Sequence, residues 1–467
     1  MRGAFLLKSI SLRHLCRVIS GKMIRGDENR TVSVVNYGKP KYISRRQVYF
    51  FGKKTAVDQQ LAAVRQAVPV AVVVPSHYSR LAFPKECAVI ETKDPYLAFW
   101  RLGLWNFRQI PVKVAAVTGS AGKSTTIAMI ASVLKKKYRI VATTNNLNTV
   151  SFLPTYLCRL SPGHNVLLLE MGMKSLNNIA RQCRVVRPQF GAVTNVGEAH
   201  FGSLGGSQNI LRAKQELVDG MRAGGVLFLN ADDARSRQLR IERTEARVFR
   251  FGMHRSAHIV ASNVRYASNG MTFQVSFNNK PYAFSIPVFG VHNVYNALAA
   301  IGMCYTMGID PALIQRGLAE YKQPSMRLQF VRGKKGTLLI NDAWNANPTA
   351  MIAGLQVLTA VAKKRYSIAV LGDMLELGSY SHRAHERVGE YIANHPVDQL
   401  VTVGSKAKEI AGTAIAKGYS KQKVANFSTR DSALHYLKNA PPNSIIYFKA
   451  SRKWHFEKLV KALKSNE

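Results

Sequence analysis

The feature that most constrains the fold is the glycine-containing segment 114–126, which reads Val-Ala-Ala-Val-Thr-Gly-Ser-Ala-Gly-Lys-Ser-Thr-Thr. Its apolar first half predicts a buried strand, and the residues from Ser124 onward predict a helix. Gly119 and Gly122 let backbone N–H groups approach a polyphosphate without obstruction by a Cβ atom. The helix N-terminus adds a favourable dipole. A strand, a tight loop and a helix in this order indicate a phosphate-binding loop.

The side chains of this loop suit a nucleotide with a bound metal ion. Lys123 can reach the β- and γ-phosphates as a point charge, and Ser124 or Thr125 can offer a hydroxyl to Mg²⁺. The loop has the compact form GxxGK[ST]T, with Val117 where the longer pattern has glycine. The alternative is a glycine turn before an ordinary helix, and the Lys-Ser-Thr register argues against it. We therefore expect the cofactor-binding loop to comprise Gly119, Ser120, Ala121, Gly122, Lys123, Ser124 and Thr125.

The rest of the chain predicts an α/β protein of three domains: residues 1–110, 111–322 and 323–467. Short apolar runs alternate with helical stretches, which is typical of a parallel sheet with crossover helices. The central domain carries a β-rich insertion at 257–288, where the dipeptides at 269–270 and 278–279 mark hairpin turns. The last domain resembles a dinucleotide-binding sheet. The predicted strands are 47–52, 68–74, 114–118, 166–170, 191–194, 226–230, 338–340, 367–371, 400–403 and 444–448.

The charge is unusual, with 66 Lys and Arg against 26 Asp and Glu, a net of +40. A nucleic-acid footprint is usually a patch or a tail. Here the excess is +13 in 1–110 (19 basic, 6 acidic), +15 in 111–322 (25 and 10) and +12 in 323–467 (22 and 10). This even distribution argues against nucleic acid as the partner and fits a general scarcity of acidic residues. A positive field would also raise the encounter rate with small anionic substrates.

The five cysteines are far apart and form no CxxC motif, which is typical of reduced thiols in a cytoplasmic protein. No apolar run approaches 18 residues, so we expect no membrane span. The apolar block 4–7 is too short for a signal-peptide core. A transit peptide is an alternative for the first twenty residues, and an amphipathic first helix fits them better. We expect a monomer.

Two further polar residues follow predicted strands of the central domain. Glu170 ends the run Leu-Leu-Leu-Glu, and His200 follows the next strand. The carboxyl ends of parallel strands share one sheet edge with the phosphate loop, so both side chains could converge beside the phosphates. Mg²⁺ prefers oxygen, which makes Glu170 the more typical ligand and His200 the less typical one. Either residue alone is more often structural.

In the order and wording of its motifs, residues 112–467 resemble the Mur ligases, ATP-dependent amide-forming enzymes of peptidoglycan synthesis. The segment 341–348, Asn-Asp-Ala-Trp-Asn-Ala-Asn-Pro, is the most specific of them, and 448–452, Phe-Lys-Ala-Ser-Arg, is a weaker match. The other matching stretches are 119–126, 144–148, 170–172, 194–200, 212–216, 230–233, 292–300 and 371–378.

The resemblance implies three domains: an N-terminal substrate-nucleotide domain, a central ATPase domain and a C-terminal domain that closes over the site. It also implies a reaction in which a UDP-muramoyl-peptide carboxylate is activated as an acyl phosphate and joined to D-alanyl-D-alanine. Cell wall formation, cell shape and cell division would depend on that product. The physical demand is neutralisation of a crowded polyanion, which suits Lys123, Mg²⁺ and helix dipoles.

The resemblance further implies roles for single residues. Lys123, Glu170, His200 and Lys214 would be catalytic, and Ser124, Glu170, His200 and Lys214 would hold metal. Lys214 falls where the family carries a carbamylated lysine; without the family it would be interpreted as a solvated helix lysine. Asn293 and Asn296 match positions near the adenine, and Arg327 and Asp342 match residues that reach the nucleotide from the C-terminal domain. Asn148, Asn345 and Asn347 would contact substrate, although turn chemistry before Pro348 also explains the last two.

The N-terminal domain departs most from the family. The family typically has an Asp-Ser-Arg element there for the uridine diphosphate, whereas residues 35–41 read Val-Asn-Tyr-Gly-Lys-Pro-Lys. Thr149 replaces a family asparagine and Ala450 a usual glycine. ATP-dependent ligation is therefore the firmer inference and the murein substrate the less firm one.

Four hypotheses remain open on the sequence alone. The chain is a Mur-type ligase that adds D-alanyl-D-alanine or a divergent paralogue; a related amide ligase with another carboxylate acceptor, such as the folate-polyglutamate type; an ATP-binding protein without ligase chemistry; or a nucleic-acid-binding protein. The segment 341–348 favours the first. Joint retention of Lys123, Glu170, His200, Lys214 and Asp342 argues against a non-catalytic protein.

Overall fold

The computed structural model describes residues 5–53, 55–144, 146–198, 201–254 and 256–465. It divides into two compact units, one of residues up to Ala115 with Tyr138–Leu169 and one of Ala116–Lys137 with the residues from Glu170 onward. The predicted division at 110 and 322 stays a prediction. Among the described residues, no helix is long and apolar enough to cross a membrane.

The first unit contains a six-stranded sheet with a parallel centre and an antiparallel strand at each edge. Its helices include α1 (Leu12–Ile19), whose buried Leu12, Leu15 and Ile19 confirm an amphipathic helix in the second half of the first twenty residues. Residues 5–11, also expected in that helix, form a strand instead. In sheet order the strands are β1 (Phe5–Ser11), β3 (Thr31–Tyr37), β4 (Gln47–Phe50), β5 (Ala71–Pro75), β6 (Ala88–Thr92) and β2 (Lys22–Arg25), and the other helices are α2 (Val57–Ala67), α3 (Pro95–Arg108) and α5 (Leu153–Leu157).

One predicted strand of this unit begins later than expected. The apolar run from Val68 predicted a strand over 68–74, but β5 begins at Ala71. Val68 instead takes a left-handed conformation, with φ of 44°, and its N–H bonds to the Val64 carbonyl. The start of the run therefore closes α2, because an apolar run does not by itself show where a helix cap ends and a strand begins.

The central sheet has seven strands. Their order is β13 (Ile259–Val260), β12 (Arg247–Gly252), β11 (Val226–Asn230), β10 (Phe190–Val193), β7 (Lys113–Thr118), β9 (Val166–Glu170) and β8 (Ile140–Ala142). The helices of this part in the second unit are α4 (Lys123–Leu134), α6 (Asn178–Val186), α7 (Phe201–Leu204), α8 (Ser207–Asp219), α9 (Val291–Thr306) and α10 (Pro311–Ala319).

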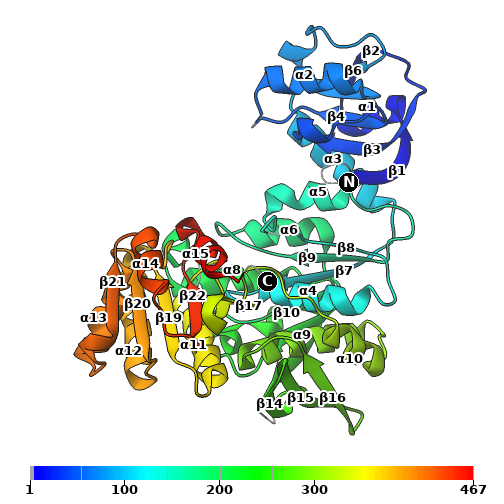
Figure 1. Cartoon of the computed structure of the whole chain (residues 1–467). Helices are drawn as coiled ribbons and strands as arrows, with labels where there is room; N and C mark the ends of the chain where they lie inside the picture. Colours follow the sequence, from blue (N-terminus) through cyan, green and yellow to red (C-terminus); the bar gives the residue numbers. More distant parts are fainter. Residues whose placement is uncertain (1–4, 54, 145, 199–200, 255, 466–467) are drawn as a thin grey trace. The chain divides into compact units, whose positions relative to one another are not determined.

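The predicted β-rich insertion is confirmed as a separate small sheet of three antiparallel strands, drawn in green in Figure 1. They are β14 (Ser262–Ala267), β15 (Gly270–Phe277) and β16 (Lys280–Ile286). Met271, Phe273, Val275 and Phe277 of β15 are buried, which is the alternation that the sequence shows. Asn278 and Asn279 adopt positive φ at the predicted turn.

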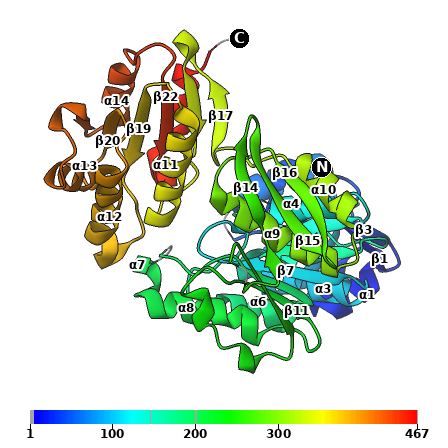
Figure 2. The ribbon, with the colours of Figure 1, turned by 90° about the horizontal axis from the view of Figure 1, so that it is seen from below.

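The last part of the chain forms a six-stranded sheet, with helices on both faces (Figure 2). Five strands are parallel, and β17 (Gln329–Arg332) pairs antiparallel with β18. In sheet order the others are β18 (Leu338–Asn341), β22 (Ile445–Lys449), β19 (Ser367–Gly372), β20 (Gln399–Val403) and β21 (Val424–Phe427), and the helices are α11 (Pro348–Ala362), α12 (Ser381–Asn394), α13 (Ala407–Ala416), α14 (Arg430–Leu437) and α15 (Glu457–Leu463).

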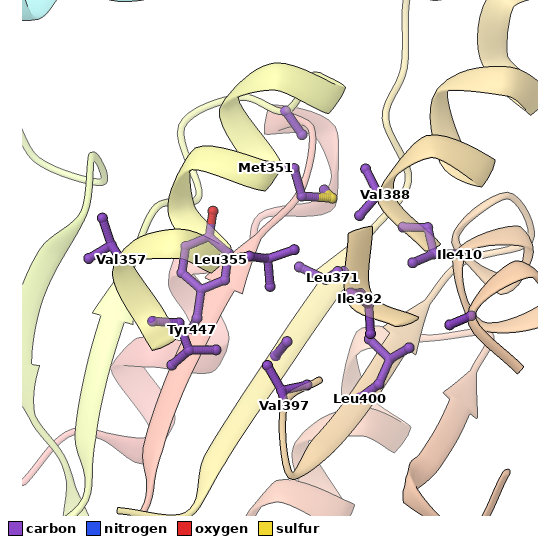
Figure 3. Close-up of a cluster of buried hydrophobic side chains, with 14 of the residues drawn as sticks. Met351, Leu355, Val357, Leu371, Val388, Ile392, Val397, Leu400, Ile410 and Tyr447 are labelled. Atoms are coloured by element: carbon purple, nitrogen blue, oxygen red, sulfur yellow. The ribbon is translucent and has the colours of Figure 1, made fainter. Parts of the chain in front are cut away.

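Alternate residues of these strands face opposite cores. Leu371, Leu400 and Tyr447 pack with Met351 and Leu355 of α11 and with residues of α12 and α13 (Figure 3). Their neighbours along the strands pack against α14 and α15 on the other face. Strands buried on both faces read as continuous apolar runs, which is why their positions could be predicted.

Asn106 ties three elements of the first unit together. Its Nδ2 donates to the carbonyl oxygens of Leu157 and Leu160, both at 2.8 Å, and its Oδ1 accepts the Lys8 N–H at 3.0 Å. The side chain is fully buried. Asn106→Leu would leave these three backbone groups without their partner, so we expect it to lower the free energy of unfolding by about 2–4 kcal/mol.

The measurement is urea unfolding of the whole chain, followed by circular dichroism. The matched control is Asn29→Leu, because Asn29 is exposed. We expect the control to change stability by less than about 0.5 kcal/mol. Equal stability of the two variants would show that Asn106 does not hold β1, α3 and α5 together.

Candidate functional site

The loop between β7 and α4 adopts a conformation that only glycine accommodates at two places. Gly119 has φ of +151° and Gly122 has φ of +81°. A Cβ on Gly119 would lie 1.9 Å from Thr194 Oγ1, and one on Gly122 would lie 2.1 Å from Asn296 Oδ1. The two glycines therefore allow both the turn and the close approach of neighbouring side chains.

The strand next to β7 holds this loop in place. Asn195 follows β10, and its Oδ1 accepts the N–H groups of Ser120 at 3.2 Å and Ala121 at 2.9 Å. Thr194 Oγ1 donates to the Ala121 carbonyl at 2.6 Å. Sequence analysis included both residues in a matching motif but gave them no role. The available signal was their position at the end of a strand that neighbours β7 in a parallel sheet.

Lys123 is the first residue of α4, and its ammonium turns back onto the loop. Its Nζ donates to the Gly119 carbonyl at 2.8 Å. Burial lowers the pKa of Lys123 from its usual value, with Arg327 acting in the same direction and Glu170 opposing it. The Lys123 amine thus lies against the loop, close to the charges of Arg327 and Glu170.

Three segments distant in the sequence meet at the hydroxyl of Ser124. Ser124 Oγ donates to Glu170 Oε2 at 2.7 Å, and Arg327 Nη2 donates to Ser124 Oγ at 3.1 Å. Glu170 is buried at the end of β9, as the strand-end argument predicted. Thr125, the next residue of α4, is also buried. His200 lies outside the described residues, so its predicted convergence with Glu170 remains a prediction.

Lys214 lies in α8 and is only 1% exposed. Its Nζ lies 3.3 Å from Thr118 Oγ1 and 3.5 Å from Met173 Sδ. Burial lowers the pKa of Lys214 well below its usual value, repulsion by Lys123 adds to this, and Glu216 and Glu170 oppose it. The interpretation of Lys214 as a solvated lysine is therefore wrong, and the environment favours the neutral amine.

Asn293 and Asn296 lie one turn apart on α9 and are buried. Asn293 Nδ2 donates to the Phe289 carbonyl at 2.8 Å, and Asn296 Nδ2 donates to Asn293 Oδ1 at 3.1 Å. Asn296 Oδ1 accepts the Thr126 hydroxyl at 3.3 Å, so α9 is joined to the start of α4 behind the loop. The predicted place of both asparagines near an adenine stays a prediction.

The predicted substrate residues lie in different surroundings. Asn345 is exposed, whereas Asn347 caps α11 by accepting the Ala350 N–H at 2.9 Å. The turn-chemistry interpretation is thus confirmed for Asn347, and a substrate contact stays a prediction for both. Asn148 is half-buried in the first unit.

The donor set at Ser124 and Glu170, a hydroxyl and a carboxylate, is the oxygen chemistry that Mg²⁺ prefers. Within the described part of the chain, no three His, Cys, Asp or Glu side chains gather as a metal-binding group. Together, the loop N–H groups, Lys123, Arg327 and these oxygens could hold a polyphosphate with one divalent cation.

Comparison with known proteins shows the family of the chain. Residues 117–304 match the Mur ligase middle domain, and residues 326–452 match the Mur ligase, glutamate ligase domain. The chain is 33% identical over 381 residues to the UDP-N-acetylmuramoyl-tripeptide–D-alanyl-D-alanine ligase of Bacillus subtilis (strain 168), covering 81% of this chain and 82% of the relative. The chain belongs to the Mur ligase family.

Solved Mur ligases extend the likeness over nearly the whole chain. A crystal structure of MurF from Acinetobacter baumannii has a TM-score of 0.85 and 26% identity, and the match covers 98% of this chain and 99% of that one. MurF of Thermotoga maritima, solved in complex with ADP, has the same fold at a TM-score of 0.76 and 22% identity, over 91% and 96% of the two chains. The predicted three-domain α/β Mur ligase fold is confirmed.

Gly122→Ala tests the loop geometry. The new Cβ would collide with the buried Asn296 amide at a residue that already has a positive φ, so the loop must shift. We expect the Kd for Mg-ATP, measured by calorimetry, to rise about tenfold or more. Gly412→Ala is the matched control, because nothing lies within 4 Å of a Cβ there. Equal affinity in both variants would contradict a phosphate-binding role for this loop.

Proposed function

We propose that this Mur ligase joins UDP-N-acetylmuramoyl-tripeptide to D-alanyl-D-alanine, with conversion of ATP to ADP and phosphate. The observation that carries the proposal is the meeting of the loop, Glu170 and Arg327 at the Ser124 hydroxyl. This meeting supports a polyphosphate site, because cations and oxygens of the kind that bind metal lie together there. The substrate pair is supported by the similarity to the Bacillus subtilis UDP-N-acetylmuramoyl-tripeptide–D-alanyl-D-alanine ligase.

The reaction proceeds in two displacements. A carboxylate oxygen of the tripeptide attacks the γ-phosphorus of ATP, the bond from that phosphorus to the β–γ bridging oxygen breaks, and ADP leaves. The free amine of D-alanyl-D-alanine then attacks the acyl carbon, the amine loses its proton, and phosphate leaves with the oxygen that joined it to the acyl group. Lys123 and the loop N–H groups bind the β- and γ-phosphates, and Arg327 approaches the same phosphates from the linker before β17.

Mg²⁺ fits the oxygen donors of Ser124 and Glu170, and when bound it would neutralise phosphate charge and orient the γ-phosphate. We propose that Lys214 provides a further oxygen ligand after carbamylation. In that step the neutral amine adds to CO₂ and loses a proton, so a cation becomes an anionic carbamate. Burial lowers the pKa of Lys214, which favours the neutral amine that this step requires. His200 is proposed as another ligand from the family resemblance alone.

The remaining roles are also proposals. Asn293 and Asn296 would lie near the adenine of ATP, and Asp342 would belong to the C-terminal residues that reach the nucleotide. Asn148, Asn345 and Asn347 would contact the peptide substrates. The N-terminal part would bind the UDP-linked substrate without the Asp-Ser-Arg element. The cytoplasmic location and the monomeric state stay predictions.

The decisive assay measures phosphate release from Mg-ATP by the purified chain, with UDP-N-acetylmuramoyl-tripeptide, with and without D-alanyl-D-alanine, and with mass detection of products. We expect release to require both substrates and the UDP-linked pentapeptide to form. Tight ATP binding without product would overturn the proposed substrate pair in favour of another carboxylate and amine or a non-catalytic role.

The carbamylation proposal predicts a dependence on CO₂. Removing dissolved CO₂ should lower the ligase rate, and added bicarbonate should restore it. Lys214→Met should be roughly 10–100-fold slower at any bicarbonate concentration. Its free energy of unfolding should not fall, because the variant no longer buries an amine. Lys174→Met, at an exposed lysine, is the matched control and should respond to bicarbonate like the wild type. A bicarbonate-independent wild-type rate would refute carbamylation.

A further inference from the structure

Lys449 is a buried charge that the proposed reaction does not use. It ends β22, in the weakly matching segment 448–452, and its side chain is 4% exposed. Its Nζ lies 2.5 Å from Asp342 Oδ2 and 3.4 Å from the Asp342 carbonyl oxygen. Burying an ammonium lowers the stability of the fold unless the charge is paired. The role of Lys449 therefore lies in the groups that its side chain contacts.

The same carboxylate oxygen receives a second hydrogen bond from β22. The Tyr447 hydroxyl donates to Asp342 Oδ2 at 3.1 Å. The Tyr447 ring lies in the apolar cluster under α11, with its hydroxyl at the edge of that cluster (Figure 3). Gly354 of α11 leaves room for this hydroxyl, since a Cβ there would lie 1.8 Å from the oxygen. One oxygen of Asp342 is thus fixed by two neighbouring donors on a rigid strand.

The other oxygen of Asp342 holds the linker that carries Arg327. Asp342 Oδ1 accepts the Leu328 N–H at 3.2 Å, and the Met326 carbonyl accepts the Trp344 N–H at 3.1 Å. Met326 and Leu328 both have positive φ, 59° and 48°. A non-glycine residue holds such a conformation only where its surroundings fix it. The two hydrogen bonds fix the backbone on either side of Arg327.

Arg327 therefore lies on a backbone segment that hydrogen bonds hold on both sides. Its guanidinium lies over the Trp344 ring at 5.9 Å and donates to Ser124 Oγ at 3.1 Å. We infer that Lys449 is a positioning residue for the phosphoryl-transfer step: it orients Asp342, which holds the Leu328 N–H and so places Arg327 at the phosphate loop. The inference rests on the proposed ATP site and adds a residue that the sequence analysis left without a role.

The test is a double-mutant cycle on the affinity for Mg-ATP, measured by calorimetry on the full chain. Lys449→Met removes the ammonium and keeps an apolar stem. We expect Lys449→Met and Arg327→Ala each to raise the Kd at least tenfold. In the Arg327→Ala background, Lys449→Met should raise the Kd less than twofold, because both changes remove the same interaction with ATP. Effects that multiply would overturn the inference, since Lys449 would then act without Arg327.

Three further variants separate positioning from general stability. Lys449→Arg should restore part of the affinity, and Tyr447→Phe, which deletes only the second donor to Asp342, should raise the Kd severalfold. Lys458→Met, at an exposed lysine of α15, is the matched control and should bind like the wild type. If Lys449→Met does not fold, the cycle is run with Tyr447→Phe, and an unchanged Kd there overturns the inference.

Steady-state kinetics give the second readout. Lys449→Met should raise the KM for ATP and lower kcat, and leave the KM for the UDP-linked peptide unchanged. A variant that only lost stability would lower the active fraction and leave every KM unchanged. Calorimetry needs no ligase turnover, so a chain that binds ATP but forms no pentapeptide would refute the proposed function and still test the role of Lys449.

Discussion

The proposed phosphate site is organised around the Ser124 hydroxyl. This hydroxyl donates to Glu170 from β9 and accepts from Arg327 on the linker before β17, so it joins the start of α4 to two segments remote in sequence. Phosphoryl transfer makes its largest demand on fixed charge, because the transferred group is a polyanion whose charge redistributes as bonds change. Three features hold hydrogen-bond donors in place around the Ser124 hydroxyl. They are the positive-φ glycines of the loop, the Asn195 side-chain amide, and the linker that is hydrogen-bonded on either side of Arg327.

Lys449 and Lys214 are both buried, and the cost of burying an amine is met in a different way at each. Lys449 forms an ion pair with Asp342, which is buried beside it, and the Tyr447 hydroxyl donates to the same carboxylate. The Lys214 amine lies beside a hydroxyl and a thioether, and burial lowers its pKa, which favours the neutral form. One lysine thus suits structural positioning, and the other suits reaction with CO₂.

Sequence alone predicted the elements whose pattern is local. The buried parallel strands, the loop and the start of α4 lie where expected, because apolar runs and glycine spacing depend on neighbouring residues. The first unit was less predictable, since polar residues interrupt the apolar runs of β1 and β3 and since Val68 caps a helix within an apolar run. The contacts of Asn195 and Lys449 were missed because each joins segments far apart in sequence. Glu170 could be placed from the geometry of strand ends, whereas His200 lies outside the described residues.

The central claim, that this site transfers a phosphoryl group to a carboxylate, is tested most directly by oxygen tracing. The peptide carboxylate is labelled with ¹⁸O in both oxygens, and the released phosphate is analysed by mass spectrometry after one turnover with ATP and D-alanyl-D-alanine. The account predicts one ¹⁸O atom in each phosphate, because the oxygen that attacks phosphorus leaves with it, and one in the new amide. Unlabelled phosphate formed together with the amide product would contradict it.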